Sequence, residues 1–253
     1  MILDKFRLDG KVAIVTGSST GLGQGVSLGF AEAGADIVGV DYVGSAETKA
    51  AVEKAGRRYL ELKFDLMTTA AIEPIIRQTL ETFGHVDILM NNAGIIRRTD
   101  ALEFSETDWD EVMNLNLKTV FFFSQAVARQ FVKQGSGGKI INVASMLSFQ
   151  GGIRVPSYTA SKSGVMGITR LMANEWAKHH INTNAIAPGY MATNNTAPLR
   201  QDAERSEEIL KRIPAGRWGT PADIQGVTVF LASAASDYVN GYTIAVDGGW
   251  LAR

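Results

Sequence analysis

The sequence predicts a single α/β domain: a doubly wound parallel sheet of about seven strands, with helices on both faces. Two observations predict it. Short apolar, β-branched segments alternate with longer segments of helical periodicity along the whole chain. Strand–helix–strand order implies right-handed crossovers, which place the helices on both faces of the sheet. No linker or shift in composition divides the 253 residues, so we expect one domain over residues 1–253.

The apolar segments show where the strands lie. Residues 12–16 are short, apolar and β-branched, which is typical of a strand buried on both faces. Later segments end at polar residues, as the second does at Asp41 and the third at Asp65. The expected strands are residues 12–16, 36–40, 58–64, 86–90, 139–144, 181–187 and 242–246.

The segments between the strands have helical spacing. The first stops at Gly34, a typical helix end, and the last opens with Pro221 near its first turn. Pro74 is expected to kink or break the third helix. Residues 190–213 are polar and low in strand signals, and we expect a mobile lid over substrate there. The expected helices are residues 22–34, 46–55, 68–83, 106–134 and 158–180, and one from Pro221.

Composition narrows the class of protein. Net charge is −1 with no block of like charges, which argues against a nucleic-acid or anionic membrane partner. There is no cysteine, and the three histidines lack metal-ligand spacing, so we expect no metal site. Met1–Lys5 carries charges where a signal peptide needs its apolar core, and no apolar run reaches the ~18 residues of a membrane span. We therefore expect a cytoplasmic protein.

A glycine-rich turn after the first strand predicts a dinucleotide site. Gly17, Gly21 and Gly23 would let a pyrophosphate approach backbone N–H groups at a helix N-terminus, in a Rossmann-type arrangement. Their spacing differs from the common G-x-G-x-x-G. Asp41 ends the second strand, where a carboxylate binds the ribose hydroxyls of NAD and repels a 2′-phosphate. The turn also lacks a basic residue, so NAD is favoured over NADP.

Tyr158 and Lys162 lie four residues apart, on one face of an expected helix. An ammonium about 5 Å from a phenol, at an effective dielectric of about 20, favours the phenolate by roughly 3 kcal/mol, or about 2 pKa units. We therefore expect Lys162 to lower the pKa of Tyr158 toward the range where acid–base catalysis is efficient. Ser145 supplies a hydroxyl just upstream.

Several motifs now coincide in chain order: T-G-x-x-x-G-x-G from Thr16, N-N-A-G from Asn91, Ser145 before Tyr158-x-x-x-Lys162, and Pro188-Gly189. Together they resemble the short-chain dehydrogenase/reductase family over essentially the whole chain. The resemblance implies an oxidoreductase that transfers a hydride between NAD(H) and a CH–OH or carbonyl group.

The resemblance also implies residue roles. Tyr158 would be the general acid–base, Lys162 would lower its pKa and bind the nicotinamide ribose, and Ser145 would hydrogen-bond the substrate. Asn116 would sustain a water-linked proton path behind Lys162. The implied cofactor contacts are Gly17, Ser19, Gly21, Leu22, Gly23, Asp41, Asp65, Leu66, Asn91, Ala93, Gly94, Tyr158, Lys162, Pro188, Gly189, Tyr190 and Thr193.

Residues 92–98, 145–156 and 246–253 resemble more closely the NAD-dependent members that act on keto sugar acids in pectin and uronate breakdown, typically homotetramers. A sugar-acid substrate needs a cation for its carboxylate. Arg154, Arg97 and Arg98 are all expected to point toward the carboxyl edge of the sheet. The candidate substrate contacts are Ser145, Gln150, Arg154, Tyr158 and Arg97.

Three alternatives stay open. Gluconate 5-dehydrogenase and 3-oxoacyl carrier-protein reductase activities share the fold, although the second usually needs NADPH, which Asp41 disfavours. A non-catalytic NADH-sensing module is a third, which the full set of motif residues disfavours. For assembly, the apolar stretch 120–123 and the glycines Gly164 and Gly167 could allow a partner helix to approach.

Overall fold

The structure is a computed structural model that describes residues 1–252. Its centre is a sheet of seven parallel strands in the order β3-β2-β1-β4-β5-β6-β7. The winding direction reverses between β1 and β4, where doubly wound sheets bind their ligands. Arg253, which closes the expected domain, lies outside the described residues. The strands are β1 (Val12–Thr16), β2 (Asp36–Asp41), β3 (Tyr59–Lys63), β4 (Ile88–Asn91), β5 (Gly138–Val143), β6 (Ile181–Pro188) and β7 (Thr243–Val246).

Strand β1 shows why the strand segments are apolar without interruption. All five of its residues are buried, and successive side chains enter opposite core layers. Ile14 packs in the layer that contains Phe123, whereas Val15 packs in the layer that contains Phe30. Both faces of the sheet are therefore covered, and the predicted doubly wound fold is confirmed.

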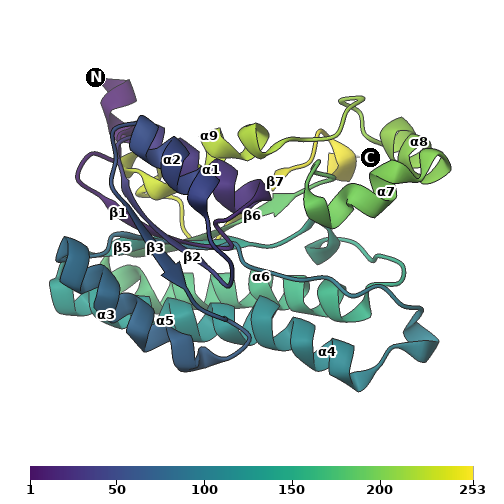
Figure 1. Ribbon diagram of the computed structural model, residues 1–253, viewed down its shortest axis with the longest axis horizontal. Coiled ribbons are helices and arrows are strands. Elements are labelled where there is room, and N and C mark those ends of the chain that lie inside the picture. The colour runs from purple at the N-terminus through teal and green to yellow at the C-terminus, as the bar shows by residue number, and fades with distance from the viewer. Residues whose placement is uncertain (253) are drawn as a thin grey trace.

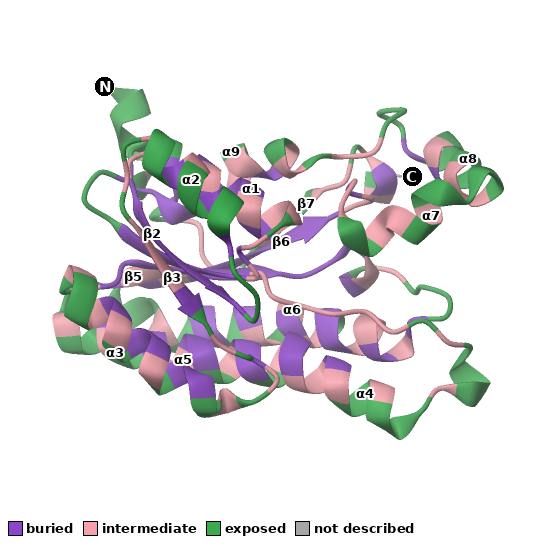
Figure 2. Cartoon of the chain, in the orientation of Figure 1, coloured by how far each residue is buried: buried purple, intermediate pink, exposed green. Residues whose placement is uncertain are grey.

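The helices form one layer on each face of the sheet. Figure 1 shows α1, α2 and α9 on one face and α3, α4, α5 and α6 on the other, with α7 and α8 beside the C-terminal end of the chain. In Figure 2 the buried stretches of these helices face the sheet, and the exposed stretches face outward. The helices are α1 (Gly21–Glu32), α2 (Ala46–Lys54), α3 (Ile72–Phe83), α4 (Glu106–Met113), α5 (Val120–Gln134), α6 (Pro156–Trp176), α7 (Ala197–Gln201), α8 (Ala203–Arg212) and α9 (Pro221–Ala232).

Two of the expected helices differ in detail. Pro74 neither kinks nor breaks a helix, because α3 begins only at Ile72 and the proline falls in its first turn, where no N–H is needed. The region 106–134 is helical throughout, but Asn114–Thr119 is a π-helix segment between α4 and α5. Such segments are frequent at functional sites.

The polar segment 190–213 is largely helical, since it contains a short 3₁₀ turn, α7 and α8. Ile209 and Ile213 of this segment pack against Met146 and Trp250, which ties it to the carboxyl edge of the sheet. Its role as a lid stays a prediction. Among residues 1–252, no helix is both long and apolar enough to cross a membrane.

Candidate active site

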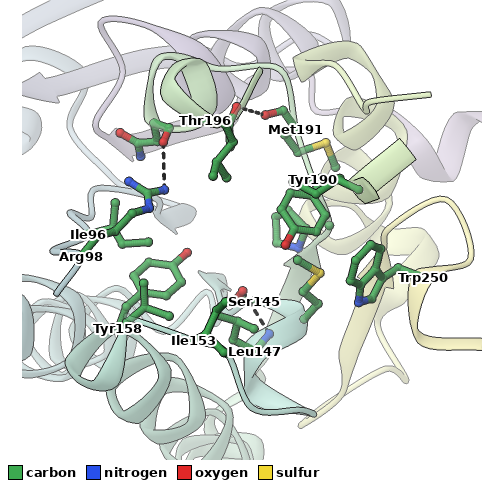
Figure 3. Close-up of a pocket in the computed structure, with 18 of the residues that line it drawn as sticks. Ile96, Arg98, Ser145, Leu147, Ile153, Tyr158, Tyr190, Met191, Thr196 and Trp250 are labelled. Atoms are coloured by element: carbon green, nitrogen blue, oxygen red, sulfur yellow. Dashed lines mark hydrogen bonds between the residues drawn. The ribbon is translucent and has the colours of Figure 1, made fainter. Parts of the chain in front are cut away.

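The carboxyl ends of the central strands open into one cavity of about 810 Å³. Its wall includes Leu22 from the start of α1, Ser145 after β5, Tyr158 from α6, Pro188 at the end of β6 and Thr193 after it. Figure 3 shows the Tyr158 and Ser145 hydroxyls directed toward this space. Because parallel strands share an edge, motifs up to about 170 residues apart in sequence meet here.

Tyr158 and Lys162 lie on one face of α6, as their spacing predicts. The Lys162 Nζ lies 5.7 Å from the centre of the Tyr158 ring. Lys162 is almost fully buried, and its Nζ donates a 2.6 Å hydrogen bond to the Val143 carbonyl at the end of β5. Ser148 donates to the Lys162 backbone carbonyl at 2.6 Å, which fixes this turn of α6 against the Ser145 loop.

The expected lowering of the Tyr158 pKa by Lys162 is wrong. Burial raises the pKa of the Tyr158 phenol above its ordinary value, and the hydrogen bond with Ser145 and the charge of Arg98 only oppose this effect. Burial also lowers the pKa of Lys162 to about 8. Desolvation therefore disfavours the charged form of both groups, and this effect depends on burial by the whole fold, not on the spacing of the two residues. At neutral pH the phenol carries its proton.

The buried lysine predicts a pH-dependent stability. Between pH 8 and 10.5 the unfolded chain holds a proton that native Lys162 has lost, so the free energy of unfolding rises with pH in this window. From pH 7.5 to 9.5 the wild type should gain about 2 kcal/mol relative to Lys162→Met. Urea unfolding of both proteins at fixed protein concentration measures this difference. The same pH dependence of the free energy of unfolding in both proteins would contradict the lowered pKa of Lys162.

Asn116 lies in the π-helix segment and is fully buried. Its side-chain amide donates to the Ile95 carbonyl and accepts from the Ile95 N–H, both at 2.9 Å, and reaches the Ser161 hydroxyl at 3.4 Å. A Cβ at Gly94 would lie 3.1 Å from the Asn116 amide oxygen and 3.7 Å from the Lys162 amine. Asn116 thus joins the loop after β4 to the helix that carries Tyr158 and Lys162.

The glycine turn packs closely against the loop after β4. Gly17 and Gly21 have positive φ angles of 66° and 58°, which other residues adopt with strain. A Cβ at Gly23 would lie only 2.0 Å from the Gly17 carbonyl oxygen. Asn92 donates to the Thr16 and Gly17 carbonyls at 2.9 and 3.1 Å, and the Ala93 N–H donates to the Thr16 hydroxyl. Leu22, the second residue of α1, forms part of the cavity wall.

Asp41 lies where the turn meets the end of β2. One carboxylate oxygen accepts from the Ser19 N–H at 3.0 Å, and the other accepts from the Tyr42 N–H at 2.8 Å. The Asp41 side chain is therefore fixed beside the turn. Asp41 contacts the glycine turn that precedes α1, and Leu22 of α1 lines the cavity together with Tyr158.

The remaining predicted cofactor residues divide into two groups. Pro188, Gly189, Tyr190 and Thr193 line the cavity. The Asn91 side chain instead points into the protein, where its amide donates to Ser124 and Asn142 at 2.9 Å, so only its backbone is available to a cofactor. Asp65 and Leu66 follow β3, beyond the cavity lining. Asp65 is exposed and accepts from the Met67 N–H, whereas Leu66 is buried in the core.

The structure corrects one predicted substrate contact. Arg97 does not line the cavity, because Glu111 and Asp108 of α4 hold its guanidinium at 2.7 and 3.4 Å. Gln150 and Arg154 do line it. Arg154 has a positive φ of 63°, and its largely exposed guanidinium lies 3.5 Å from Asp100.

Arg98 is the better-placed cation. Its guanidinium lines the cavity, donates to the Asn195 carbonyl at 3.1 Å, and acts electrostatically on Tyr158. Figure 3 shows it on the same side of the cavity as the phenol. Within residues 1–252, no carboxylate pairs with it at salt-bridge distance. Asp108 and Glu111 of α4 pair with Arg97 and not with Arg98. Both acidic residues are visible in the sequence, but the expected helix 106–134 does not show toward which arginine they point.

Further lining residues come from α8 and the C-terminal segment, which sequence reasoning did not select. Arg212 lies over the Trp250 ring at 4.0 Å and donates to Gln150 at 3.4 Å. Tyr190 packs edge-on against Trp250, with ring centres 4.9 Å apart. No local pattern marks these residues, because only the folded chain brings α8 and the C-terminal segment to this edge.

Comparison with known proteins agrees with this geometry. The family model described as Enoyl-(Acyl carrier protein) reductase matches residues 17–251. The chain is 70% identical to the 2-dehydro-3-deoxy-D-gluconate 5-dehydrogenase of Escherichia coli K12, and the match covers the whole of both chains.

The chain belongs to the short-chain dehydrogenase/reductase family.

One further relative and one solved structure are also similar to this short-chain dehydrogenase/reductase over nearly its whole length. A 2-dehydro-3-deoxy-D-gluconate 5-dehydrogenase of Bacillus subtilis 168 is 53% identical, over 99% of this chain and 98% of its own length. A crystal structure of a gluconate 5-dehydrogenase from Burkholderia cenocepacia, in complex with NADP and tartrate, is 41% identical with a TM-score of 0.95, and each chain is covered completely. The protein is therefore an oxidoreductase that uses a nicotinamide cofactor.

Proposed function

We propose that this short-chain dehydrogenase/reductase interconverts 2-dehydro-3-deoxy-D-gluconate and 2,5-didehydro-3-deoxy-D-gluconate with NAD(H), a step of pectin and uronate breakdown in the cytoplasm. One observation carries the proposal: Ser145 and Tyr158 line a cavity that Arg98 also lines, and Lys162 lies one turn beyond Tyr158 on the same helix. An acid–base group and an anion-binding group thus lie on one wall. The identity to relatives with that activity supports the substrate.

The residues divide the chemistry among them. When bound, the nicotinamide cofactor supplies or accepts the hydride. Tyr158 is protonated at neutral pH, so it can give its proton to the carbonyl oxygen at C5 during reduction. Ser145, within hydrogen-bonding reach of Tyr158, orients that oxygen. Lys162 orients the cofactor ribose, and Asn116 holds the loop that passes beside the lysine. Closure of the segment 190–213 over the cavity would exclude water.

We propose NAD as the preferred cofactor, although the Burkholderia relative binds NADP. Support comes from Asp41, whose carboxylate would lie near a 2′-phosphate and repel it. The wild type should therefore show a higher kcat/KM with NADH than with NADPH. Asp41→Asn removes the charge, keeps one acceptor oxygen, and should reduce the NADH preference by at least about tenfold, or ~1.4 kcal/mol. An unchanged preference would show that Asp41 does not discriminate.

We also propose a homotetramer. A groove between α5 and α6 contains the half-exposed apolar side chains Val132 and Leu171, and Phe122 is exposed nearby. Gly164 does not serve this surface as expected, because Leu117 of the same chain fills the space beside it, where a Cβ on Gly164 would lie 2.8 Å from Leu117. A Cβ on Gly167 would meet no atom within 4 Å. A Val132→Glu/Leu171→Glu double variant should run as a smaller species in light scattering coupled to size exclusion. A wild type that is already monomeric would exclude the tetramer.

A substrate panel separates this function from its alternatives. Purified protein is assayed by NADH and NADPH absorbance with 2,5-didehydro-3-deoxy-D-gluconate, 5-keto-D-gluconate and a 3-oxoacyl carrier-protein thioester. We expect the highest kcat/KM with the first compound. A preference for 5-keto-D-gluconate would favour the gluconate 5-dehydrogenase alternative. Binding of NADH without turnover of any compound would favour an NADH-sensing module.

A further inference from the structure

A buried row of hydroxyl groups connects β3 to the glycine turn. The Tyr59 hydroxyl lies 3.3 Å from the Ser18 hydroxyl and 2.7 Å from the Ser45 hydroxyl. Glu61 accepts from both the Ser45 hydroxyl at 3.1 Å and the Ser45 N–H at 2.6 Å. Ser18 and Ser45 are almost fully buried, so neither has water as an easy substitute partner.

Strand β2 contains a glycine where this row crosses it. A Cβ on Gly39 would lie 1.7 Å from the Tyr59 hydroxyl and 2.8 Å from the Ser18 hydroxyl. Tyr59 pairs with Ile37 in the sheet, so its ring passes over the next same-face position of β2, which is Gly39. Any other residue at Gly39 would displace the phenol. The glycine thus makes room for one specific hydrogen-bonding path.

The carboxylate sets the direction of every proton in the row. Glu61 in its ionised form only accepts, so the single hydroxyl proton of Ser45 is used toward it. Tyr59 must then donate to Ser45, and Ser18 must donate to Tyr59. A glutamate is ionised at neutral pH, and the Ser45 N–H lowers the pKa of the Glu61 carboxyl further, which favours the accepting form.

The row ends on the two segments that border the proposed cofactor site. Ser18 belongs to the glycine turn, and the next residue, Ser19, donates its N–H to Asp41. Ser45 closes the loop that follows Asp41 and precedes α2. A second contact also joins the glycine turn to α2: the Thr48 hydroxyl donates to the Ser18 carbonyl at 2.8 Å.

We propose that Tyr59 is a positioning residue for the adenosine half of the cofactor site. Through Ser18 and Ser45 it fixes the spacing between the glycine turn and the Asp41 loop. The inference rests on the proposed cofactor role of that turn. Tyr59 contacts neither the substrate cavity nor the Tyr158 hydroxyl. Loss of the Tyr59 hydroxyl therefore weakens dinucleotide binding and leaves the chemical step intact.

The test is the binding of ADP-ribose and NADH to Tyr59→Phe, measured by calorimetry and fluorescence, with Tyr238→Phe as the matched control on a fully exposed tyrosine. ADP-ribose contains the adenosine half and lacks nicotinamide. We expect Tyr59→Phe to raise both dissociation constants about five- to tenfold. The kcat at saturating NADH and the KM for the sugar acid should stay within about twofold of wild type.

Further variants test the row itself. Ser45→Ala should weaken ADP-ribose binding as Tyr59→Phe does. Glu61→Gln, which keeps an acceptor oxygen, should bind more tightly than Glu61→Leu. An unchanged ADP-ribose affinity in both Tyr59→Phe and Ser45→Ala would overturn the inference, and so would an equal fall in kcat and affinity. A wild type that binds neither ADP-ribose nor NADH would instead refute the proposed function.

Discussion

Replacement of Tyr158 by phenylalanine should lower kcat by about 10²- to 10⁴-fold and leave the dissociation constant for NADH within about threefold of wild type. The phenol is the group in the cavity that is placed to give a proton to a substrate oxygen, with Ser145 beside it and Lys162 one turn further along α6. Phenylalanine keeps the ring and removes only the hydroxyl. The variant therefore separates proton transfer from packing.

The pH dependence of the wild type follows from the raised pKa of Tyr158. Because burial keeps the phenol protonated at neutral pH, carbonyl reduction has its acid available there. Alcohol oxidation needs the phenolate, so its kcat/KM should rise as pH increases above neutrality. Steady-state rates in both directions from pH 6 to 10 measure this. Equal pH profiles in the two directions, or a Tyr158→Phe variant with wild-type turnover, would refute the assignment.

Replacement of Arg98 by methionine should lower kcat/KM for the sugar acid by about 10²-fold, as expected for the loss of a charge-assisted hydrogen-bonding pair to a carboxylate. Arg98 lines the cavity and, among the described residues, has no carboxylate within salt-bridge distance. The matched variant Arg154→Met should lose less than about fivefold, since that guanidinium is 60% exposed and lies beside Asp100.

A neutral ketone of similar size is the control for the Arg98 prediction. Arg98→Met should have little effect on its KM, because it has no carboxylate to bind. Arg98 also lowers the pKa of Tyr158, so the variant should shift the pH profile of oxidation toward higher pH. A larger loss for Arg154→Met than for Arg98→Met would place the carboxylate on the other side of the cavity.

Local patterns were enough to predict most of the fold. A strand such as β1 is buried on both faces, so its sequence is uniformly apolar, and the turn after it needs Gly17 and Gly21 for their positive φ angles. Both are properties of a few neighbouring residues. The same holds for Tyr158 and Lys162, whose spacing of four places them on one face of α6.

The features that the sequence did not predict depend on distant residues. Whether Arg97 or Arg98 faces the cavity depends on Glu111, which lies on a separate helix. The pKa of Tyr158 depends on burial by the whole fold, which outweighs its neighbour four residues away. The contact of Tyr59 with Ser18 depends on the register of β2 and β3, which no single segment of the sequence specifies.

Deuterium transfer from NADH that carries deuterium at both C4 positions of the nicotinamide tests the central claim most directly. The wild type is mixed with labelled NADH and 2,5-didehydro-3-deoxy-D-gluconate, and the sugar acid is recovered for mass spectrometry and NMR. We predict one deuterium at C5 of the product with the wild type, and at least about 10²-fold less labelled product over the same time with Tyr158→Phe. Recovery of unlabelled sugar acid from a wild-type protein that binds NADH would contradict hydride transfer at this site.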